Sequence, residues 1–399
     1  MAISSAEQMR QWQGHALFSY GFRPFFLFGA LWAGLAMVLW VLVLAGALAL
    51  PSRLDPLSWH AHAFLFGYLS AVIAGFLLTA VPNWTGRLPV VGRALAGLFG
   101  IWLLGRGAVL FSALLPFWLV ALLELAFPLV LGLMILREIL AGKNWKNFVV
   151  LVMLGVFALA DALFLYEAAQ GGIAAQGIGF RLGLGTVLMM ISLIGGRIIP
   201  SFTRNWLARE KLEARPSSPM QAFDKAVLLS SALGLLLWVI APAMVITALA
   251  LACIGGLHLA RLMRWKGLLT FSDPLVAILH ISYLLVPLGA IAMSLAILMP
   301  DLLSTASAQH LWMAGAFGGM TLAVMTRASL GHTGHALKAG PGTKLIYAAI
   351  LAATAARFIA GIWPSAALVD LTAALWCTAF FGFVALYGPL LWRPKERAS

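Results

Sequence analysis

Long apolar runs recur along this chain, and only short polar turns separate them. A helix rises about 1.5 Å per residue, so roughly 20 apolar residues cross the hydrocarbon core of a membrane. Such runs lie at about 25–49, 60–80, 92–114, 116–141, 147–169, 178–199, 224–241, 243–264, 274–299, 311–328, 343–361 and 366–391. A chain in lipid must satisfy its backbone hydrogen bonds internally, which favours helices. We therefore predict an all-α polytopic membrane protein with about twelve transmembrane helices, forming a single transmembrane domain over residues 1–399.

The few charged residues support this topology by their positions. Hydrophobic residues make up 62% of the chain and charged residues 10%, which excludes an ordinary soluble domain. The net charge of +13 comes from basic residues that follow every second run, for example Arg87 and Arg93 after the second run. The turns after runs three, five, seven, nine and eleven contain no Lys or Arg. This positive-inside pattern predicts that both termini are cytoplasmic, with the lipid bilayer rather than nucleic acid as the partner.

Three of the runs end in similar sequences. The second ends at 80–87 (AVPNWTGR), the sixth at 199–206 (IPSFTRNW) and the tenth at 324–334 (VMTRASLGHTG). Self-similarity at a regular spacing indicates a structural repeat. We predict three four-helix repeats, at about 20–141, 147–264 and 274–391, around a pseudo-threefold axis. The alternative is that helix ends converge on Trp, Asn and Arg because these residues suit the membrane interface.

Histidines near the outer ends of two runs are the first candidates for chemistry, because ionisable groups inside a membrane are costly. His60 and His62 open the second run, and His310 opens the tenth. Residues i and i+2 of a helix point about 200° apart, so His60 and His62 serve either two different cofactors or one ligand position and one supporting position. If the second and tenth runs are equivalent, His310 approaches this pair, and the trio suits haem iron. Alternatively, these histidines bind loop carbonyls at the membrane interface.

Other ionisable groups lie deeper or toward the cytoplasmic side. His280 lies near mid-membrane and is either a metal ligand or a buried histidine bonded to a neighbouring helix. His332 and His335 have an i, i+3 spacing that suits copper, or they belong to a solvated turn. Glu124 and Asp161 lie at similar depths in the fourth and fifth runs. They form either a proton relay or a polar clamp between helices.

Four arginines and two cysteines complete the candidates. Arg87, Arg106, Arg197 and Arg327 lie in or near helix ends, where they either bind haem propionates or extend to the membrane interface. The two cysteines, Cys253 and Cys377, fall inside apolar runs, and we expect them to be small core residues without a disulfide. The sequence contains no Walker loop, GxSxG or HExxH motif.

Several of these segments together resemble the NnrS family. They are 22–26 (FRPFF), 59–62 (WHAH), 66–68 (FGY), 71–87, 199–205, 279–280 and 324–334. The resemblance covers nearly the whole chain. It implies a bacterial inner-membrane protein that contains haem and copper and is associated with nitric oxide metabolism or nitrosative stress. It also places His60, His62, His280, His310 and His332 within family motifs.

One position departs from the family pattern. Members often carry Glu-Met after the second histidine of the pair, where this chain has Ala63 and Phe64. If that glutamate moves protons, Glu124 or Asp161 replaces it here. By analogy only, haem–copper oxidases also have a twelve-span core in three arcs, with a haem between the second and tenth helices. The sixth and seventh runs of this chain contain no histidine, so the copper site of those oxidases is not reproduced.

The resemblance leads to a functional hypothesis. A nitric oxide reductase-type oxidoreductase would convert 2 NO to N2O, with b-type haem held by His60, His62 and His310. His280 or His332 would complete a second metal site, for which copper is the candidate metal. Glu124 and Asp161 would belong to the proton path, and an unidentified donor would supply electrons. Two alternatives stay open, which are a haem-based nitric oxide sensor or scavenger without turnover, and a membrane transporter.

Overall fold

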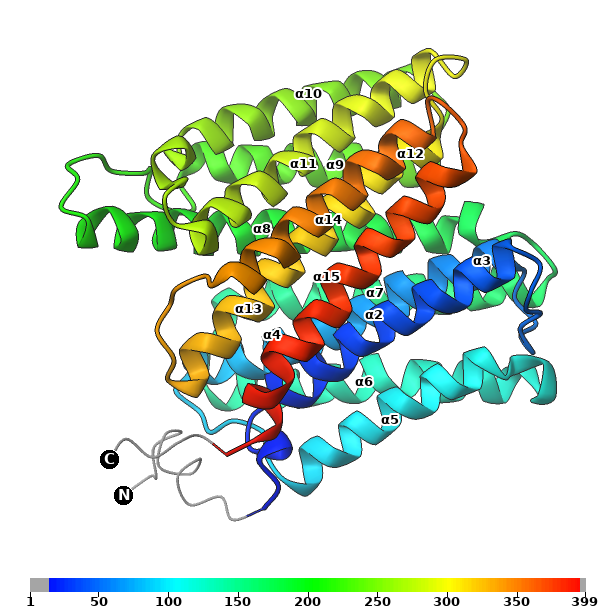
Figure 1. Cartoon of the computed structure of the whole chain (residues 1–399), viewed down its shortest axis with the longest axis horizontal. Coiled ribbons are helices and arrows are strands. Elements are labelled where there is room, and N and C mark those ends of the chain that lie inside the picture. The colour runs from blue at the N-terminus through cyan, green and yellow to red at the C-terminus, as the bar shows by residue number, and fades with distance from the viewer. Residues whose placement is uncertain (1–13, 395–399) are drawn as a thin grey trace. The chain divides into compact units, whose positions relative to one another are not determined.

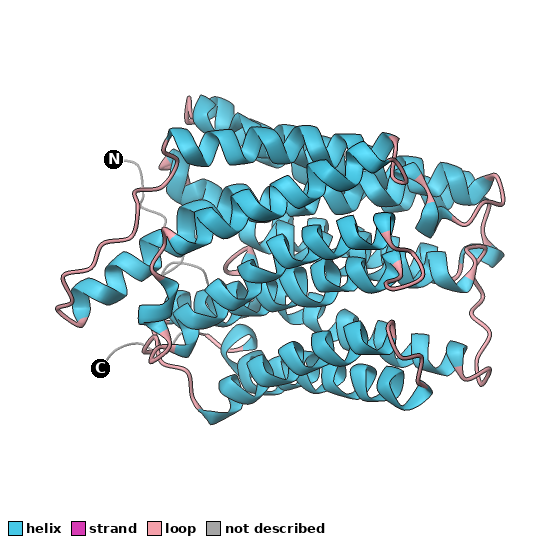
Figure 2. Cartoon of the chain, turned by 90° about the horizontal axis from the view of Figure 1, so that it is seen from above, coloured by secondary structure: helices cyan, strands magenta, loops and turns pink. Residues whose placement is uncertain are grey.

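The computed structural model of the chain describes residues 14–394. Within that range the chain consists of helices and loops, with no strand (Figures 1 and 2). Eleven helices are long and apolar enough to cross a membrane. The predicted tenth run falls within residues 305–333, which are helical throughout but divided into three segments. The prediction of an all-α polytopic membrane protein is thus confirmed, while the ends at 1–13 and 395–399 lie outside the described residues.

The chain divides into two compact units. Among the described residues, the first unit comprises 14–183, 329–335 and 383–394, and the second comprises 184–328 and 336–382. The helices of the first unit are η1 (Ala16–Phe18), α2 (Phe22–Leu44), α3 (Pro56–His62), η2 (Ala63–Tyr68), α4 (Leu69–Thr85), α5 (Arg93–Leu110), η3 (Ser112–Leu114), α6 (Phe117–Ala141), η4 (Trp145–Asn147), α7 (Phe148–Ala169) and η5 (Ala174–Gln176). The helices of the second unit are α9 (Ala222–Ile240), α10 (Val245–Met263), η6 (Gly267–Thr270), α11 (Pro274–Leu298), α12 (Thr305–His310), η7 (Leu311–Gly318) and α14 (Pro341–Ala360). The helices α8 (Ile178–Arg209), α13 (Gly319–Thr333) and α15 (Ala366–Trp392) contribute residues to both units.

Two of the short segments are π-helices, and each begins directly after a candidate histidine. η2 follows His62 within the long span Pro56–Thr85, and η7 follows His310. A π-helical turn holds one more residue than an α-helical turn, and such turns are frequent at functional sites. The second and tenth predicted runs thus share an irregularity, as equivalent positions in a repeat would. The four-helix repeat itself stays a prediction.

Acidic and polar residues start several helices. Asp55 precedes Pro56 at the start of α3 and accepts a hydrogen bond from the backbone N–H of Ser58 at 3.0 Å. Proline suits this position because the first helical N–H groups have no partner within the helix. At the start of α9, Gln221 and Asp224 accept each other's backbone N–H groups in a capping box. Asp224 is therefore fixed at the beginning of α9, a placement that matters for the site in the second unit.

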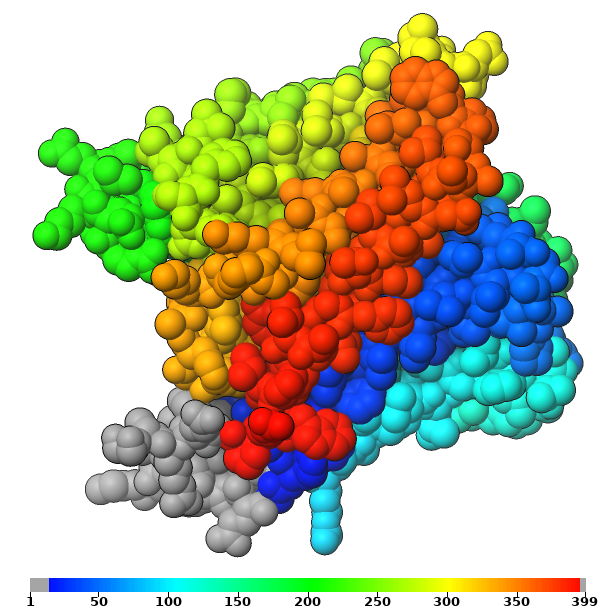
Figure 3. Space-filling view, in the orientation of Figure 1, coloured from blue at the N-terminus to red at the C-terminus, as the bar shows by residue number. Residues whose placement is uncertain are grey.

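The surface of the helices is apolar, as lipid contact requires. Leu104, Leu133 and Leu229 are among many large hydrophobic side chains that are exposed. Cys253 is also exposed, so the expectation that it is a core residue was wrong, and its helix turns this face outward. In the second unit, α8 continues to Arg209 and the segment after it projects from its neighbours (Figures 1 and 3).

Candidate functional site

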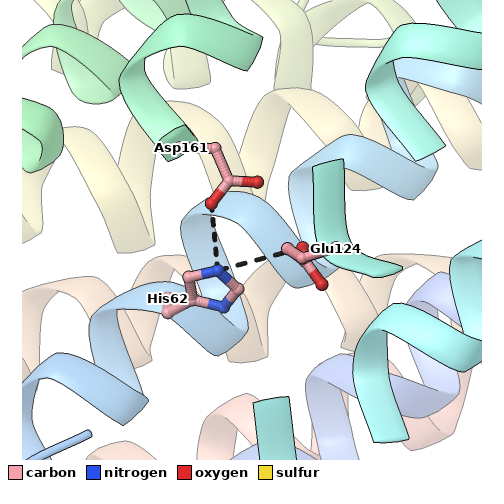
Figure 4. Close-up of side chains that lie close together, drawn as sticks. All are labelled: His62, Glu124 and Asp161. Carbon is pink, nitrogen blue, oxygen red and sulfur yellow. Dashed lines mark hydrogen bonds and ion pairs between the residues drawn. The ribbon is translucent and has the colours of Figure 1, made fainter. Parts of the chain in front are cut away.

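Four ionisable side chains from four different helices meet inside the first unit. They are His62 of α3, Arg106 of α5, Glu124 of α6 and Asp161 of α7, and all four are buried. Figure 4 shows one ring nitrogen of His62 facing both carboxylates. Ionisable groups within membrane spans are rare and usually mark ion or proton sites. We call these four residues the His62 cluster.

The distances in the His62 cluster are those of direct contact. Nε2 of His62 lies 3.1 Å from Oδ1 of Asp161 and 3.8 Å from Oε1 of Glu124. One ligand atom from each of these three residues lies within 4.8 Å of the other two. Arg106 donates from Nη2 to Oε1 of Glu124. The predicted similar depth of Glu124 and Asp161 brings them together, with His62 as their shared neighbour.

The π-helix η2 shapes the position of Arg106. Gly67 in η2 has no side chain, and a Cβ there would lie 2.5 Å from Nη1 of Arg106 and 2.8 Å from Nε1 of Trp32. The carbonyls of η2 accept hydrogen bonds from indole groups, from Trp32 to Ala63 at 2.8 Å and from Trp102 to Gly67 at 3.1 Å. The guanidinium of Arg106 also lies over the Trp102 ring, 5.8 Å from its centroid. The irregular helix thus admits a buried arginine beside the cluster.

The charges of the His62 cluster do not balance. Arg106 neutralises Glu124, whereas the ionic contact of Asp161 is to His62. With a neutral His62 and both carboxylates ionised, the cluster would carry one more negative charge than positive charge. In addition, His62 Nδ1, Glu124 Oε2 and Arg106 Nε have no hydrogen-bond partner among the described residues. A buried excess charge is strongly destabilising, and the three ligand-bearing side chains could hold a compensating proton or metal ion.

Aromatic rings enclose the cluster on the His62 side. The ring centroid of His62 lies 5.3 Å from that of Phe66 and 5.5 Å from that of Phe164. Apolar surroundings lower the local dielectric and strengthen each electrostatic interaction. This enclosure makes the missing positive charge more costly than it would be in water.

The family model described as NnrS protein matches residues 16–395, nearly the whole chain. The chain belongs to the NnrS family. NnrS proteins are associated with the response to nitric oxide. A search of curated proteins finds no relative that matches this NnrS chain.

The other predicted histidines of this NnrS protein have separate surroundings. His60 stacks on Trp40 with ring centroids 4.4 Å apart, so His60 and His62 face different neighbours, as their spacing implies. His310, in the second unit, has Nδ1 at 2.6 Å from the carbonyl oxygen of Ala306. The structure places His62, unlike His60, at the two carboxylates.

Two more histidines and the arginines lie elsewhere in the NnrS chain. Nε2 of His280 lies 2.8 Å from Oγ1 of Thr203, and the His332 ring stacks on Tyr20 with centroids 5.2 Å apart. Arg87 forms an ion pair with Glu138 at 3.4 Å. The guanidinium of Arg327 lies 4.1 Å from the ring centroid of Phe202, and the carbonyl of Arg197 accepts a hydrogen bond from Ser201.

Another buried arginine, Arg261 of the second unit, belongs to a cluster that the sequence did not indicate. Nε of Arg261 donates to Oδ1 of Asp224 at 2.7 Å. Its Nη1 donates to the carbonyl of Ser192 at 2.8 Å and to the hydroxyl of Tyr283 at 3.0 Å. Arg261 is one of the basic residues that follow every second apolar run, so the positive-inside pattern alone accounts for its charge in the sequence. Asp224 begins α9 and Arg261 lies near the end of α10, so their equal depth in neighbouring antiparallel helices was the available signal.

A chain of hydrogen bonds continues from this arginine. The hydroxyl of Ser231 donates to the carbonyl of Val227 at 2.7 Å, so it accepts from Nε2 of His258 at 2.9 Å. Nδ1 of His258 then accepts from the hydroxyl of Tyr283 at 2.8 Å. The donors and acceptors along this chain match, because each hydroxyl donates one hydrogen bond and accepts another. We call Arg261, Asp224, Tyr283 and His258 the Arg261 cluster.

Proposed function

We propose that this protein reduces nitric oxide to nitrous oxide inside a bacterial inner membrane, as part of the defence against nitrosative stress, with both termini in the cytoplasm. The observation that carries the proposal is the His62 cluster, an uncompensated ionisable site among the spans of an NnrS protein. The balanced reaction is 2 NO + 2 e⁻ + 2 H⁺ → N2O + H2O. It needs an electron donor, which we expect to be a separate protein or quinol, and it needs protons at a site within the membrane.

The residues of the His62 cluster suit the proton side of this reaction. Nitric oxide is small and uncharged, so it reaches a buried site through lipid, whereas protons need polar side chains. Glu124 and Asp161 accept and release protons, and Arg106 supplies a fixed positive charge where the reaction builds negative charge. A positioned acid or base of this kind contributes about 10²–10⁴-fold to a rate.

A histidine can bind haem iron only through a ring nitrogen that carries no proton, so the hydrogen bonds of each ring indicate which histidines suit haem. Nδ1 of His310 donates to the carbonyl of Ala306, so Nε2 keeps its lone pair, which is the state of an iron-ligating histidine. His310 therefore fits haem, and we propose His60, in the first unit, as a separate candidate haem ligand. Nε2 of His62 lies against Asp161, so we assign His62 to the cation site. Haem, when bound, supplies nitric oxide binding and one-electron transfer.

The remaining metal and anion positions follow the family resemblance. His280 retains Nδ1 without a hydrogen-bond partner among the described residues, and it is the residue we propose for copper, with His332 as the alternative. Arg197 and Arg327 are proposed to bind haem propionates. Arg87 is the weakest of the three proposed propionate partners, because it already pairs with Glu138.

The test is an optical and product assay on the detergent-purified protein from haem-replete cells. We expect a Soret band, quantified as pyridine haemochrome, that shifts with nitric oxide, and we expect N2O by gas chromatography once a reductant is added. His310→Ala is expected to lose haem. Asp161→Asn is expected to keep haem but lower N2O production by about 100-fold. Glu138→Gln, which removes a carboxylate outside the cluster, is the matched control and should change neither.

Two outcomes would replace the proposal. A Soret band that shifts with nitric oxide, without N2O under any competent reductant, would indicate a sensor or scavenger. A protein that contains no haem after haem-replete expression would indicate a transporter, which can also be built from repeats with binding sites near the middle of the membrane.

A further inference from the structure

We propose that the cation held by the His62 cluster is a divalent metal ion, and that His62, Glu124 and Asp161 form a non-haem iron(II) site. The three side chains come from α3, α6 and α7 and converge from three directions (Figure 4). The inference deepens the proposed function, on which it rests only for the identity and role of the ion, because the site itself follows from the geometry of the cluster.

The donor set indicates the class of metal. One imidazole nitrogen and two carboxylate oxygens suit iron(II) or manganese(II), whereas copper(I) and structural zinc prefer sulfur or several imidazoles. Sets of three histidine and carboxylate ligands leave other coordination positions open, as in non-haem iron(II) oxygenases. An open position is what a small diatomic ligand needs. The donors suit iron(II) or manganese(II), and the binding of nitric oxide in the proposed function selects iron(II) between them.

The spacing of the donors agrees with one ion. Ligand bonds of about 2.1 Å place two donors on opposite sides of an ion roughly 4.2 Å apart, and adjacent donors closer. Nε2 of His62 lies 3.1 Å from Oδ1 of Asp161, within that limit. It lies 3.8 Å from Oε1 of Glu124, which Arg106 binds, and Oε2 of the same carboxylate is the oxygen left for the ion. All three residues offer ligand atoms within 4.8 Å of one another, so binding one ion would require only a small closure of the side chains.

An unpartnered oxygen points to the same conclusion. Oε2 of Glu124 has no hydrogen-bond partner in the described part of the chain, and the residue is 1% exposed. A buried carboxylate oxygen left without a partner costs about 1–3 kcal/mol or more. Oε1 is already bound by Arg106, which acts as a positioning residue for Glu124. A metal ion that binds the second oxygen would satisfy Glu124 completely.

The charge sum gives the ion a role in the proposed reaction. With both carboxylates ionised, as metal binding requires, Arg106, Glu124 and Asp161 sum to a charge of −1, and a divalent ion changes this sum to +1. Nitric oxide gains negative charge when it takes up electrons. A site that is positive by one charge in a dry environment stabilises that change, whereas a proton on His62 would only bring the sum to zero.

The experiment measures the metal independently of turnover. The holoprotein is treated with a chelator, reloaded anaerobically with iron(II), and its non-haem iron is determined beside its haem. Nitric oxide is then added, and EPR separates the high-spin signal of non-haem ferrous nitrosyl from the low-spin signal of haem nitrosyl. We expect stoichiometric non-haem iron and the high-spin signal. His62→Ala, Glu124→Gln and Asp161→Asn should lose both and keep the haem spectrum, which shows that they fold.

The matched control is Glu138→Gln, which should retain the non-haem iron. Wild-type protein that takes up no non-haem iron, or cluster variants that hold as much iron as the wild type, would overturn the inference. Iron binding without N2O production leaves the inference standing and overturns the proposed function. N2O production by a protein without non-haem iron would overturn the inference and leave the proposed function standing.

Discussion

Each unit of the molecule contains one buried arginine cluster, and the two clusters are built from similar parts. Arg106 and Arg261 each pair with a carboxylate on another helix, and each lies over a tryptophan four residues away in sequence. Each guanidinium also packs against a glycine where a Cβ would collide with it, which is Gly67 for Arg106 and Gly196 for Arg261. The difference lies in balance. In the Arg261 cluster one carboxylate meets one arginine, both ring nitrogens of His258 are bonded, and among the described residues only Nη2 of Arg261 lacks a hydrogen-bond partner. The His62 cluster has a second carboxylate and three atoms without a partner, one of them a carboxylate oxygen.

The Arg261 cluster therefore has the features of a structural site, and the His62 cluster has those of a binding site. A cluster with equal numbers of acidic and basic groups holds neighbouring helices together and has no acceptor free for a cation. A cluster with a second carboxylate and an unpartnered carboxylate oxygen gains stability when it binds a cation. The same substitution should therefore have opposite consequences in the two units.

The largest effect is expected for Asp224→Asn in the second unit. The change leaves the Arg261 guanidinium buried without its carboxylate, and breaking a buried pair in this way costs about 3–5 kcal/mol of the free energy of unfolding. Denaturant titration in detergent micelles measures the loss. A value near that of the wild type would show that the Arg261 cluster is not structural.

The matching change in the first unit, Asp161→Asn, should affect activity rather than stability. It removes the excess negative charge, so the free energy of unfolding of the chelator-treated protein should not fall. N2O production should fall about 100-fold, equivalent to about 2.7 kcal/mol. A loss of stability as large as that of Asp224→Asn would erase the distinction between the clusters.

An intermediate effect is expected for Gly67→Ala in η2. The new methyl group would lie 2.5 Å from Nη1 of Arg106 and would push the guanidinium away from Glu124. Such overpacking costs about 1–3 kcal/mol, and retention of non-haem iron should fall with it. Gly97→Ala is the matched control, because nothing lies within 4 Å of a Cβ there and alanine favours a helix. Equal iron content in both variants would disprove the role of Gly67.

The smallest effect is expected for Tyr283→Phe. The change removes one hydroxyl from the Arg261 cluster, while Arg261 keeps its bonds to Asp224 and Ser192. The loss should be about 1 kcal/mol of unfolding free energy. Haem content, non-haem iron and N2O production should stay at wild-type values, and a clear fall in N2O would assign chemistry to the second unit as well.

The sequence predicts the helices of this protein well because hydropathy and length determine them directly. The predicted run at 274–299, for example, corresponds to α11 at Pro274–Leu298. The two π-helices could not be predicted, since η2 and η7 have the same apolar composition as the α-helices around them. Their hydrogen-bond pattern depends on tertiary partners, such as Trp32 on the carbonyl of Ala63.

The site was predicted in part. Depth along the membrane can be estimated from the sequence, and the similar depths of Glu124 and Asp161 predict that the two can meet. The rotation of each helix about its axis could not be estimated, because apolar residues surround these helices on all sides and give no clear inner face. His62 was therefore grouped with His60 and His310 as a haem ligand, although its neighbours are the two carboxylates.

The extra residue in the π-helical turn affects how the direction of His62 is related to the packing of the helix that follows it. One residue corresponds to about 100° of helix rotation, so η2 separates the direction of His62 from the packing face of α4 that follows. The two halves of the span can change their partners independently. Deleting one residue within Ala63–Tyr68 would restore a regular helix and turn α4 by about that angle relative to His62. His62 could then no longer face the carboxylates while α4 keeps its present packing face.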